Sequence, residues 1–135
     1  CQAGACIEAG GDPCDALSTC VAAAGCNGAS SDIRLLQCTL LNCKDQMQAC
    51  NGPFGAADCA IMLKCAQSCP DIGCQSACMI QSSYEANLQF LEVGICLEDN
   101  CPDAITDPMS NLQCITGTCG TQFNTCCGGS FMGCL

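Results

Sequence analysis

The chain is 135 residues long, the size of one small domain, and 20 of its residues are cysteine. Thirteen acidic residues against three basic ones give a net charge of −10, which argues against nucleic acid and anionic membrane surfaces as partners. The chain has no histidine, so it cannot assemble a Ser-His or Cys-His nucleophile.

Helix signals dominate the first third of the chain. Asp12 is a suitable N-cap for a helix over 14–24, and Gly25 is a natural stop. Ser30 or Ser31 precedes a second apolar-periodic stretch, which we expect to run as one helix to about residue 50. Asn-Gly-Pro at 51–53 then breaks the pattern.

Helix signals also dominate the rest of the chain. A third helix is predicted over 56–69, and a fourth begins near Gly73 with an interruption around Ser82. Ser82 and Glu85 have capping-box spacing for the continuation to about residue 100. Another helix follows Asp107-Pro108 and runs through Cys114, and the glycine-rich tail after Cys126 is expected to be irregular. Strand signals are poor, so the sequence predicts an all-α fold.

One cysteine motif occurs twice. Leu-Gln-Cys-x4-Cys-x6-Cys stands at 36–50 and again at 112–126, and shorter spacings recur elsewhere. We therefore expect a single domain over 1–135, built from degenerate repeats at about 1–50, 51–101 and 102–135. Each repeat is too small to bury a core alone, so stacking and cross-links must stabilise it.

The cysteines favour disulfides over metal ligation. Zinc sites usually contain Cys-x2-Cys pairs with further Cys or His, and this chain has neither Cys-x2-Cys nor histidine. An even count allows up to ten bridges. The predicted fold is thus a small disulfide-rich array of short helical hairpins, and the expected location is secreted, extracellular or on the cell surface, with the periplasm as an option.

The most informative spacing surrounds a tight turn. Cys65-x3-Cys69 and Cys74-x3-Cys78 flank Pro-Asp-Ile-Gly, and residues four apart lie on one face of a helix. Two such helices fold back as an antiparallel hairpin, which predicts the bridges Cys69–Cys74 and Cys65–Cys78. This pattern resembles the α-hairpinin motif over about fourteen residues. Adjacent Cys126 and Cys127 should bond to different partners, and the other pairings stay open.

A second resemblance covers most of the chain. The spacing Asp-Cys-x5-Cys-x3-Cys-x4-Cys-x3-Cys over 58–78, followed by Cys-x4-Cys at 96–101, resembles cysteine-rich secreted proteins and lipoproteins of myxobacteria and related bacteria. Asp12-Pro13-Cys14 matches the Asp-Pro units of that family, whereas Asp107-Pro108-Met109 lacks the cysteine. The resemblance implies a location outside the cytoplasm more than an activity.

Cys1 has two interpretations. Bacterial lipoproteins begin with a lipid-modified cysteine, which makes Cys1 a candidate lipid anchor. The competing interpretation is an ordinary bridge half, because Cys1-x4-Cys6 repeats a spacing found elsewhere and lipidation would leave an odd number of cysteines. No run of eighteen apolar residues occurs, so no membrane span is predicted.

No residue set predicts an enzyme, a metal site or a cofactor. Lys44 beside Cys43 and Lys64 beside Cys65 could activate a thiol, but both fit surface lysines next to bridge halves. The acidic stretch over 98–107 matches no EF-hand spacing and fits a solvated helix end.

Only 12% of the residues are charged, so the surface must contain small polar and apolar groups. Apolar patches on such a surface would favour contacts with a partner, and the competing interpretation is a neutral surface of small residues that the acidic groups keep in solution. We therefore expect a non-enzymatic extracellular structural protein that packs into a filament, a coat or an envelope complex, with itself or another extracellular protein as partner. The first alternative is a monomeric binding or inhibitor module that presents the loops 51–57 or 128–133. The second is a thiolate metal store that binds Cu(I) or Zn²⁺.

Overall fold

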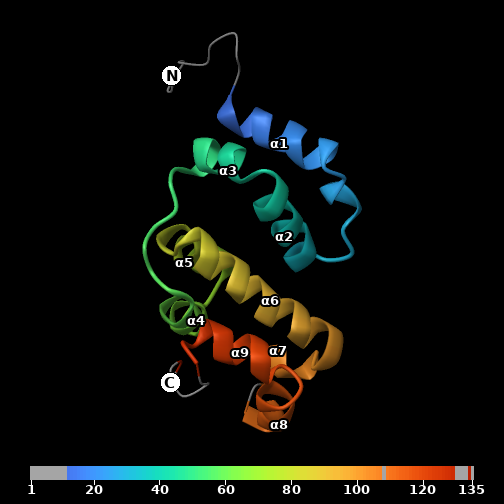
Figure 1. Cartoon of the computed structure of the whole chain (residues 1–135), viewed down its shortest axis with the longest axis vertical. Helices are drawn as coiled ribbons and strands as arrows, with labels where there is room; N and C mark the ends of the chain where they lie inside the picture. The colour runs from blue at the N-terminus through green and yellow to red at the C-terminus, as the bar shows by residue number, and fades with distance from the viewer. Residues whose placement is uncertain (1–11, 108, 130–133, 135) are drawn as a thin grey trace. The chain divides into compact units, whose positions relative to one another are not determined.

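The computed structural model describes residues 12–107, 109–129 and 134. Within these residues the chain is helical and forms no strand (Figure 1). An isolated parallel bridge joins Ala57 to Ser82. The predicted all-α, disulfide-rich fold class is confirmed. The helices in chain order are α1 (Pro13–Ala23), η1 (Cys26–Gly28), α2 (Asp32–Asn42), α3 (Lys44–Asn51), α4 (Cys59–Gln67), α5 (Ile72–Gln81), α6 (Tyr84–Asn100), α7 (Asp103–Thr106), η2 (Met109–Asn111), α8 (Leu112–Thr116) and α9 (Gly120–Cys126).

Short polar side chains cap the starts of α1, α2, α4, α5 and α6, as the sequence predicts for the first two. The Asp12 carboxylate accepts a hydrogen bond from the Cys14 backbone N–H at 2.9 Å. The Ser31 hydroxyl accepts one from the Arg34 N–H at 3.3 Å. Each cap satisfies a donor that the first helical turn leaves without a partner. Gly25 follows α1 with φ of 78°, a left-handed conformation that stops the helix.

Several predicted helix boundaries are wrong. The third helix begins at Cys59 and not at residue 56, and the helix expected after Asp107-Pro108 is divided into a 3-10 helix over Met109–Asn111 and α8. The helix expected from residue 32 to about 50 breaks at Cys43, whose φ of −129° and ψ of 35° are not helical. The break redirects the chain after a cysteine that is bonded to α1. The cap of α6 is Ser83, which accepts from the Ala86 N–H, and the Ser82 hydroxyl instead donates to the Cys78 carbonyl.

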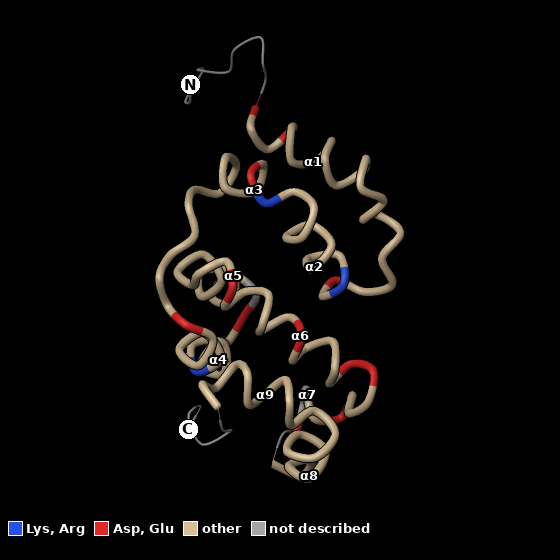
Figure 2. The backbone as a smooth tube through the Cα atoms, in the orientation of Figure 1, with Lys and Arg blue, Asp and Glu red and all other residues tan. Residues whose placement is uncertain are grey.

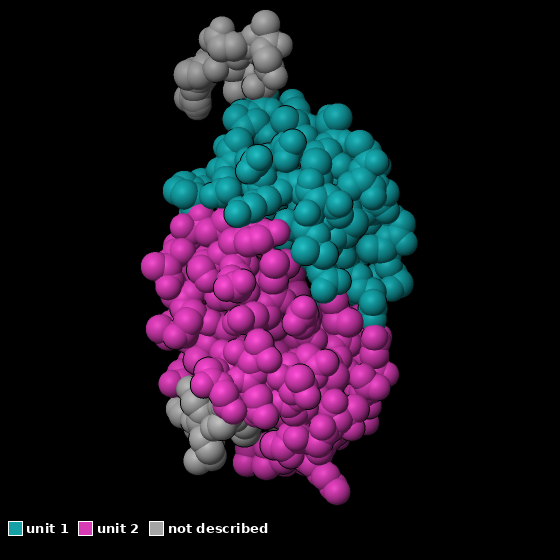
Figure 3. Space-filling view, in the orientation of Figure 1, with its two compact units in different colours: residues 1–53 teal, residues 54–135 magenta. Residues whose placement is uncertain are grey.

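The chain forms two compact units, residues 1–53 and residues 54–135 (Figure 3). In unit 1, α1 packs on α3, and α2 contacts both of them. Its fully buried side chains are Cys26, Leu40 and Cys43, so half-cystines provide much of this small core. The division of the sequence into three repeats stays a prediction.

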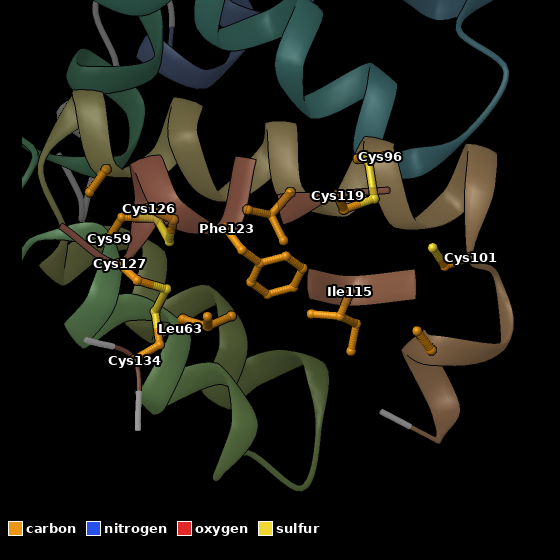
Figure 4. Packing of buried hydrophobic residues seen from close by; sticks show 13 residues of the cluster. Cys59, Leu63, Cys96, Cys101, Ile115, Cys119, Phe123, Cys126, Cys127 and Cys134 are labelled. Carbon is orange, nitrogen blue, oxygen red and sulfur yellow. A yellow bond between two sulfur atoms is a disulfide. The ribbon is translucent and has the colours of Figure 1, made fainter. Parts of the chain in front are cut away.

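Unit 2 has the larger core. Helix α4 packs on α5 and α6, and α6 packs on α9. Leu63, Val93, Ile115 and Phe123 are buried together and are surrounded by half-cystines, as Figure 4 shows for most of them. In the part of the chain that the structure describes, no helix is long and apolar enough to cross a membrane.

Candidate functional site

Three nested disulfides close unit 1. Cys14–Cys50, Cys20–Cys43 and Cys26–Cys38 span 36, 23 and 12 residues, each inside the one before. The first half of each bridge comes from α1 or η1, and the second half comes from α2, α3 or the break between them. The result is a helical hairpin with cross-links along its whole length.

The turn between α4 and α5 brings the predicted cysteines together. Cys65 is bonded to Cys78 and Cys69 to Cys74, the two pairs that the spacing around Pro70 predicts. Asp71 caps α5 by accepting a hydrogen bond from the Cys74 N–H at 2.9 Å, which fixes the start of the second helix directly after the turn.

Two further nested disulfides join α6 and the residue after it to the segment 112–126. Cys96–Cys119 spans 23 residues, as Cys20–Cys43 does, and Cys101–Cys114 lies inside it. Cys119 is a non-helical residue directly before α9, just as Cys43 is a non-helical residue directly before α3. The two copies of the repeated sequence motif therefore adopt the same local structure.

The outermost bridge differs between these two copies. Counterparts lie 76 positions apart in the sequence (38 and 114, 43 and 119, 50 and 126), so Cys126 corresponds to Cys50. The partner of Cys50 is Cys14, whose counterpart is Phe90, and Phe90 cannot form a bridge. Cys126 is bonded instead to Cys59 at the start of α4. This disulfide links the α4–α5 hairpin covalently to the segment 112–126. Sequence reasoning missed this cross-link, although the aligned motif shows where a cysteine is lacking.

The sulfur atoms gather in two clusters. The Sγ atoms of Cys65, Cys69 and Cys78 lie within 4.8 Å of one another, and the Sγ atoms of Cys69 and Cys78 are 3.6 Å apart. Cys126, Cys127 and Cys134 form the second cluster. All of these cysteines are in disulfides, and Cys127 is bonded to Cys134. A disulfide sulfur is not the thiolate that binds a soft metal, so either cluster would need a reductant before it could bind one.

An apolar groove lies in unit 1 between α1 and α2. Its volume is about 500 Å³, and Met47 of α3 also lines it. None of its lining residues is charged, and the polar groups among them are Ser18, Asn27 and Thr39. The apolar lining residues are Leu17, Val21, Leu35, Leu36 and Met47. A cavity of this size and chemistry suits an apolar side chain or ligand. The sequence did not predict this groove.

The remaining candidates do not gather into a site. Lys44 and Lys64 are exposed, and the neighbouring Cys43 and Cys65 are in disulfides, so neither cysteine offers a thiol for a lysine to activate. Residues 98–100 end α6, where the Asn100 amide donates to the Cys96 carbonyl. Cys1 and Cys6 lie outside the described residues, so the lipid-anchor hypothesis stays a prediction.

The two candidate inhibitory loops differ. The backbone N–H groups of Gly55 and Ala57 donate to carbonyls at the end of α5, so residues 55–57 of the first loop are fixed against that helix. The loop 128–133 is described only at Gly128 and Gly129. Gly52 and Pro53 are exposed, and the aromatic ring of Phe54 next to them packs edge to face on Tyr84, with ring centroids 5.4 Å apart.

The chain matches no protein-family model, no curated protein and no solved structure.

Proposed function

We propose that this protein is a non-enzymatic extracellular structural protein whose disulfides keep it folded while it packs into an assembly. The observation that carries the proposal is that every cysteine among the described residues is bonded to another cysteine. Disulfides at this density persist in oxidising compartments and are reduced in the cytosol. A compartment outside the cytoplasm therefore suits the chain.

Exposed apolar side chains support the assembly. Leu41, Ile61 and Ile80 are each about half exposed or more, and Met109 is 75% exposed. Such side chains are covered by water in a monomer and by a neighbour in an assembly, and the second state removes apolar surface from water. The disulfides allow a small unit to use apolar residues on its surface, because its fold depends less on a large core.

Two measurements test the proposal. The intact mass under non-reducing conditions is expected to be lower than the fully reduced mass by one hydrogen atom per cysteine, with no uptake of an alkylating reagent. Light scattering is expected to give a particle several times heavier than 13.8 kDa at high protein concentration. Alkylation of many cysteines in the native protein would contradict the scaffold role and favour the thiolate metal store.

The second candidate is a monomeric secreted binding module. The groove of unit 1 favours it, because an apolar groove with a few polar groups also suits a small ligand. A particle that stays at 13.8 kDa over the whole concentration range, with all cysteines oxidised, would select this candidate over an assembly.

A further inference from the structure

The Cys69–Cys74 disulfide has two properties that no other bridge among the described residues combines. Both of its cysteines are only half-buried. The Sγ atom of Cys69 also lies 3.6 Å from the Sγ atom of Cys78, which belongs to the neighbouring Cys65–Cys78 disulfide. A small thiol in solution can therefore reach this bridge, and a second disulfide lies close enough to exchange with it.

Two other groups of cysteines have these properties one at a time. Cys14 and Cys50 are both half-buried, but within the described residues neither belongs to a group of three sulfur atoms that lie within 4.8 Å of one another. The Sγ atoms of Cys126, Cys127 and Cys134 form such a group, but all three cysteines are buried. The first group offers access without a neighbouring disulfide, and the second offers neighbouring disulfides without access.

The Cys69–Cys74 bridge lies at the end of the α4–α5 hairpin that is remote from the entry of the chain into unit 2. The N–H of Gly55 donates to carbonyls over 80–82 at the end of α5, whereas Cys74 lies in the first turn of that helix. Helix α5 has 10 residues, so it is about 15 Å long. Pro70 and Asp71 of the turn are exposed. A change of bonding at this turn therefore leaves the start of unit 2 in place.

We propose that the turn between α4 and α5 is a thiol–disulfide exchange site that takes a small monothiol. The thiolate of the incoming molecule attacks the Sγ atom of Cys74, forms a mixed disulfide there and expels the Cys69 thiolate. The freed Cys69 side chain rotates into line with the Cys65–Cys78 bond and attacks Cys78. This second step forms Cys69–Cys78 and expels the Cys65 thiolate, which takes up the proton that the monothiol lost. Two disulfides are present before and after, so no oxidant or reductant is consumed.

The charges around the hairpin favour movement of the negative charge from Cys69 to Cys65. The Sγ atom of Cys69 lies 3.2 Å from the carbonyl oxygen of Cys65, and this oxygen disfavours a thiolate on that sulfur. Cys65 directly follows the exposed Lys64, the only basic residue of unit 2 (Figure 2), and a nearby ammonium group favours a thiolate over a thiol. Attack on Cys78 also expels the half-buried Cys65 thiolate, whereas a thiolate on the buried Cys78 would lose its water.

The second step also determines where an adduct accumulates. After attack on the Cys14–Cys50 bridge, the displaced thiolate stays beside the mixed disulfide and expels the monothiol again, because the fold holds the two sulfur atoms together. At the turn, the Cys69 thiolate is consumed by Cys78, so this return is suppressed. The exchange thus converts a chain whose described cysteines are all bonded into one that presents Cys65 as a thiol.

Peptide mapping after a brief exchange tests the site. The full-length oxidised protein is incubated with a low concentration of 2-mercaptoethanol, an uncharged monothiol that the acidic chain does not repel. It is then alkylated with excess iodoacetamide and digested with pepsin at acidic pH, where thiolates are protonated and exchange stops. Cys74 is expected to carry mercaptoethanol and Cys65 the alkyl group, and a peptide linked through Cys69 and Cys78 is expected to appear.

Two double variants supply the controls. Cys65→Ala with Cys78→Ala removes the receiving disulfide, so the alkyl group is expected on Cys69, with less adduct on Cys74 because the displaced thiolate closes the bridge again. Cys14→Ala with Cys50→Ala removes a disulfide of unit 1 and keeps both bridges of the hairpin, so the wild-type pattern is expected. Circular dichroism checks that each variant is folded, and the mapping of the wild-type protein is a complete test without them.

The outcomes separate the exchange site from the proposed function. An alkyl group on Cys69 of the wild-type protein, with Cys65–Cys78 intact, overturns the second step. First uptake at Cys14–Cys50, or no uptake at the turn, overturns the assignment of the site. Each of these outcomes leaves the proposed function standing, because light scattering of the untreated protein tests assembly independently. Alkylation of many cysteines before any thiol is added contradicts both.

Discussion

At the residue scale, Gly55 shows how closely the backbone packs where the segment after unit 1 meets the end of α5. Its N–H donates to the carbonyls of Ile80 and Ser82 at 3.0 and 3.1 Å. A Cβ added to Gly55 would overlap the backbone carbonyl group of Gln81. Backbone atoms cannot rotate away as a side chain can, so only glycine fits this crossing.

We predict that Gly55→Ala lowers the free energy of unfolding by about 1–3 kcal/mol, the usual range for steric overpacking. The segment must move away from α5, which also breaks the hydrogen bond from Ala57 to Gln81. Chemical denaturation of the oxidised protein measures the change. Gly120→Ala is the control, because a Cβ at Gly120 meets no atom within 4 Å. Equal stability of Gly55→Ala and Gly120→Ala would contradict the prediction.

Asn87 is a buried polar residue whose side chain forms hydrogen bonds where α5 ends and α6 begins. It is 1% exposed, and its Nδ2 donates to the carbonyls of Met79 and Ser83 at 2.9 Å and of Ser82 at 3.4 Å. Each of these carbonyls also accepts a backbone N–H, from Ser82, Asn87 and Gly55 respectively, so the amide adds a second hydrogen bond to each one. The three bonds also fix the orientation of the amide, since only the nitrogen donates.

We predict that Asn87→Asp destabilises the protein, and more strongly at pH 7 than at pH 4. A carboxylate cannot donate to the three carbonyls, and burial disfavours its charge, so the pKa of the introduced group is higher in the folded state than in the unfolded state. The penalty is therefore small below the unfolded pKa and grows as the pH rises through the folded one. Denaturation at several pH values measures it, with exposed Asn124→Asp as the control. A difference that does not change with pH would contradict the mechanism.

At the element scale, local chemistry made much of the fold predictable. Asp12, Ser31 and Gly25 mark helix ends through their own side chains or through the lack of one, so the sequence could indicate them directly. The pairing across the α4–α5 turn was predictable for the same reason, because a four-residue connection leaves the flanking cysteines few other partners.

Features that depend on distant partners were not predictable in this way. The break at Cys43 has no glycine or proline to mark it, and the apolar pattern continues across it. The bond between Cys59 and Cys126 closes 67 residues, and nothing near either cysteine specifies the other. The groove was missed because it depends on how the helices of unit 1 pack, and periodicity shows only which residues are apolar.

The long bridge is predicted to stabilise unit 2 more than the short one. Replacing Cys59 and Cys126 together with alanine should lower the free energy of unfolding by about 4 kcal/mol, because the loop that the bond closes is long even with the other bridges intact. Replacing Cys69 and Cys74 should lower it by about 2 kcal/mol, since that bond closes only five residues. Denaturant unfolding of the two double variants compares them. The opposite order would contradict the loop-entropy explanation.

At the scale of the whole molecule, the disulfides respect the boundary between the units. Cys14–Cys50, Cys20–Cys43 and Cys26–Cys38 lie inside unit 1, and every other bridge among the described residues lies inside unit 2. Each unit is thus closed covalently on itself. A chain divided in this way does not need one unit as a template for the disulfides of the other.

We therefore predict that a peptide of residues 12–53 folds alone and forms the three nested bridges of unit 1. Its six cysteines allow about 15 complete pairings, so recovery of one pairing as the main product shows that the helices direct oxidation. Oxidation in a glutathione buffer followed by peptide mapping identifies the product, and circular dichroism measures its helix content. The same peptide oxidised in strong denaturant is the control and should give a mixture. A mixture without denaturant would show that unit 1 depends on unit 2 to fold, even though no described bridge joins them.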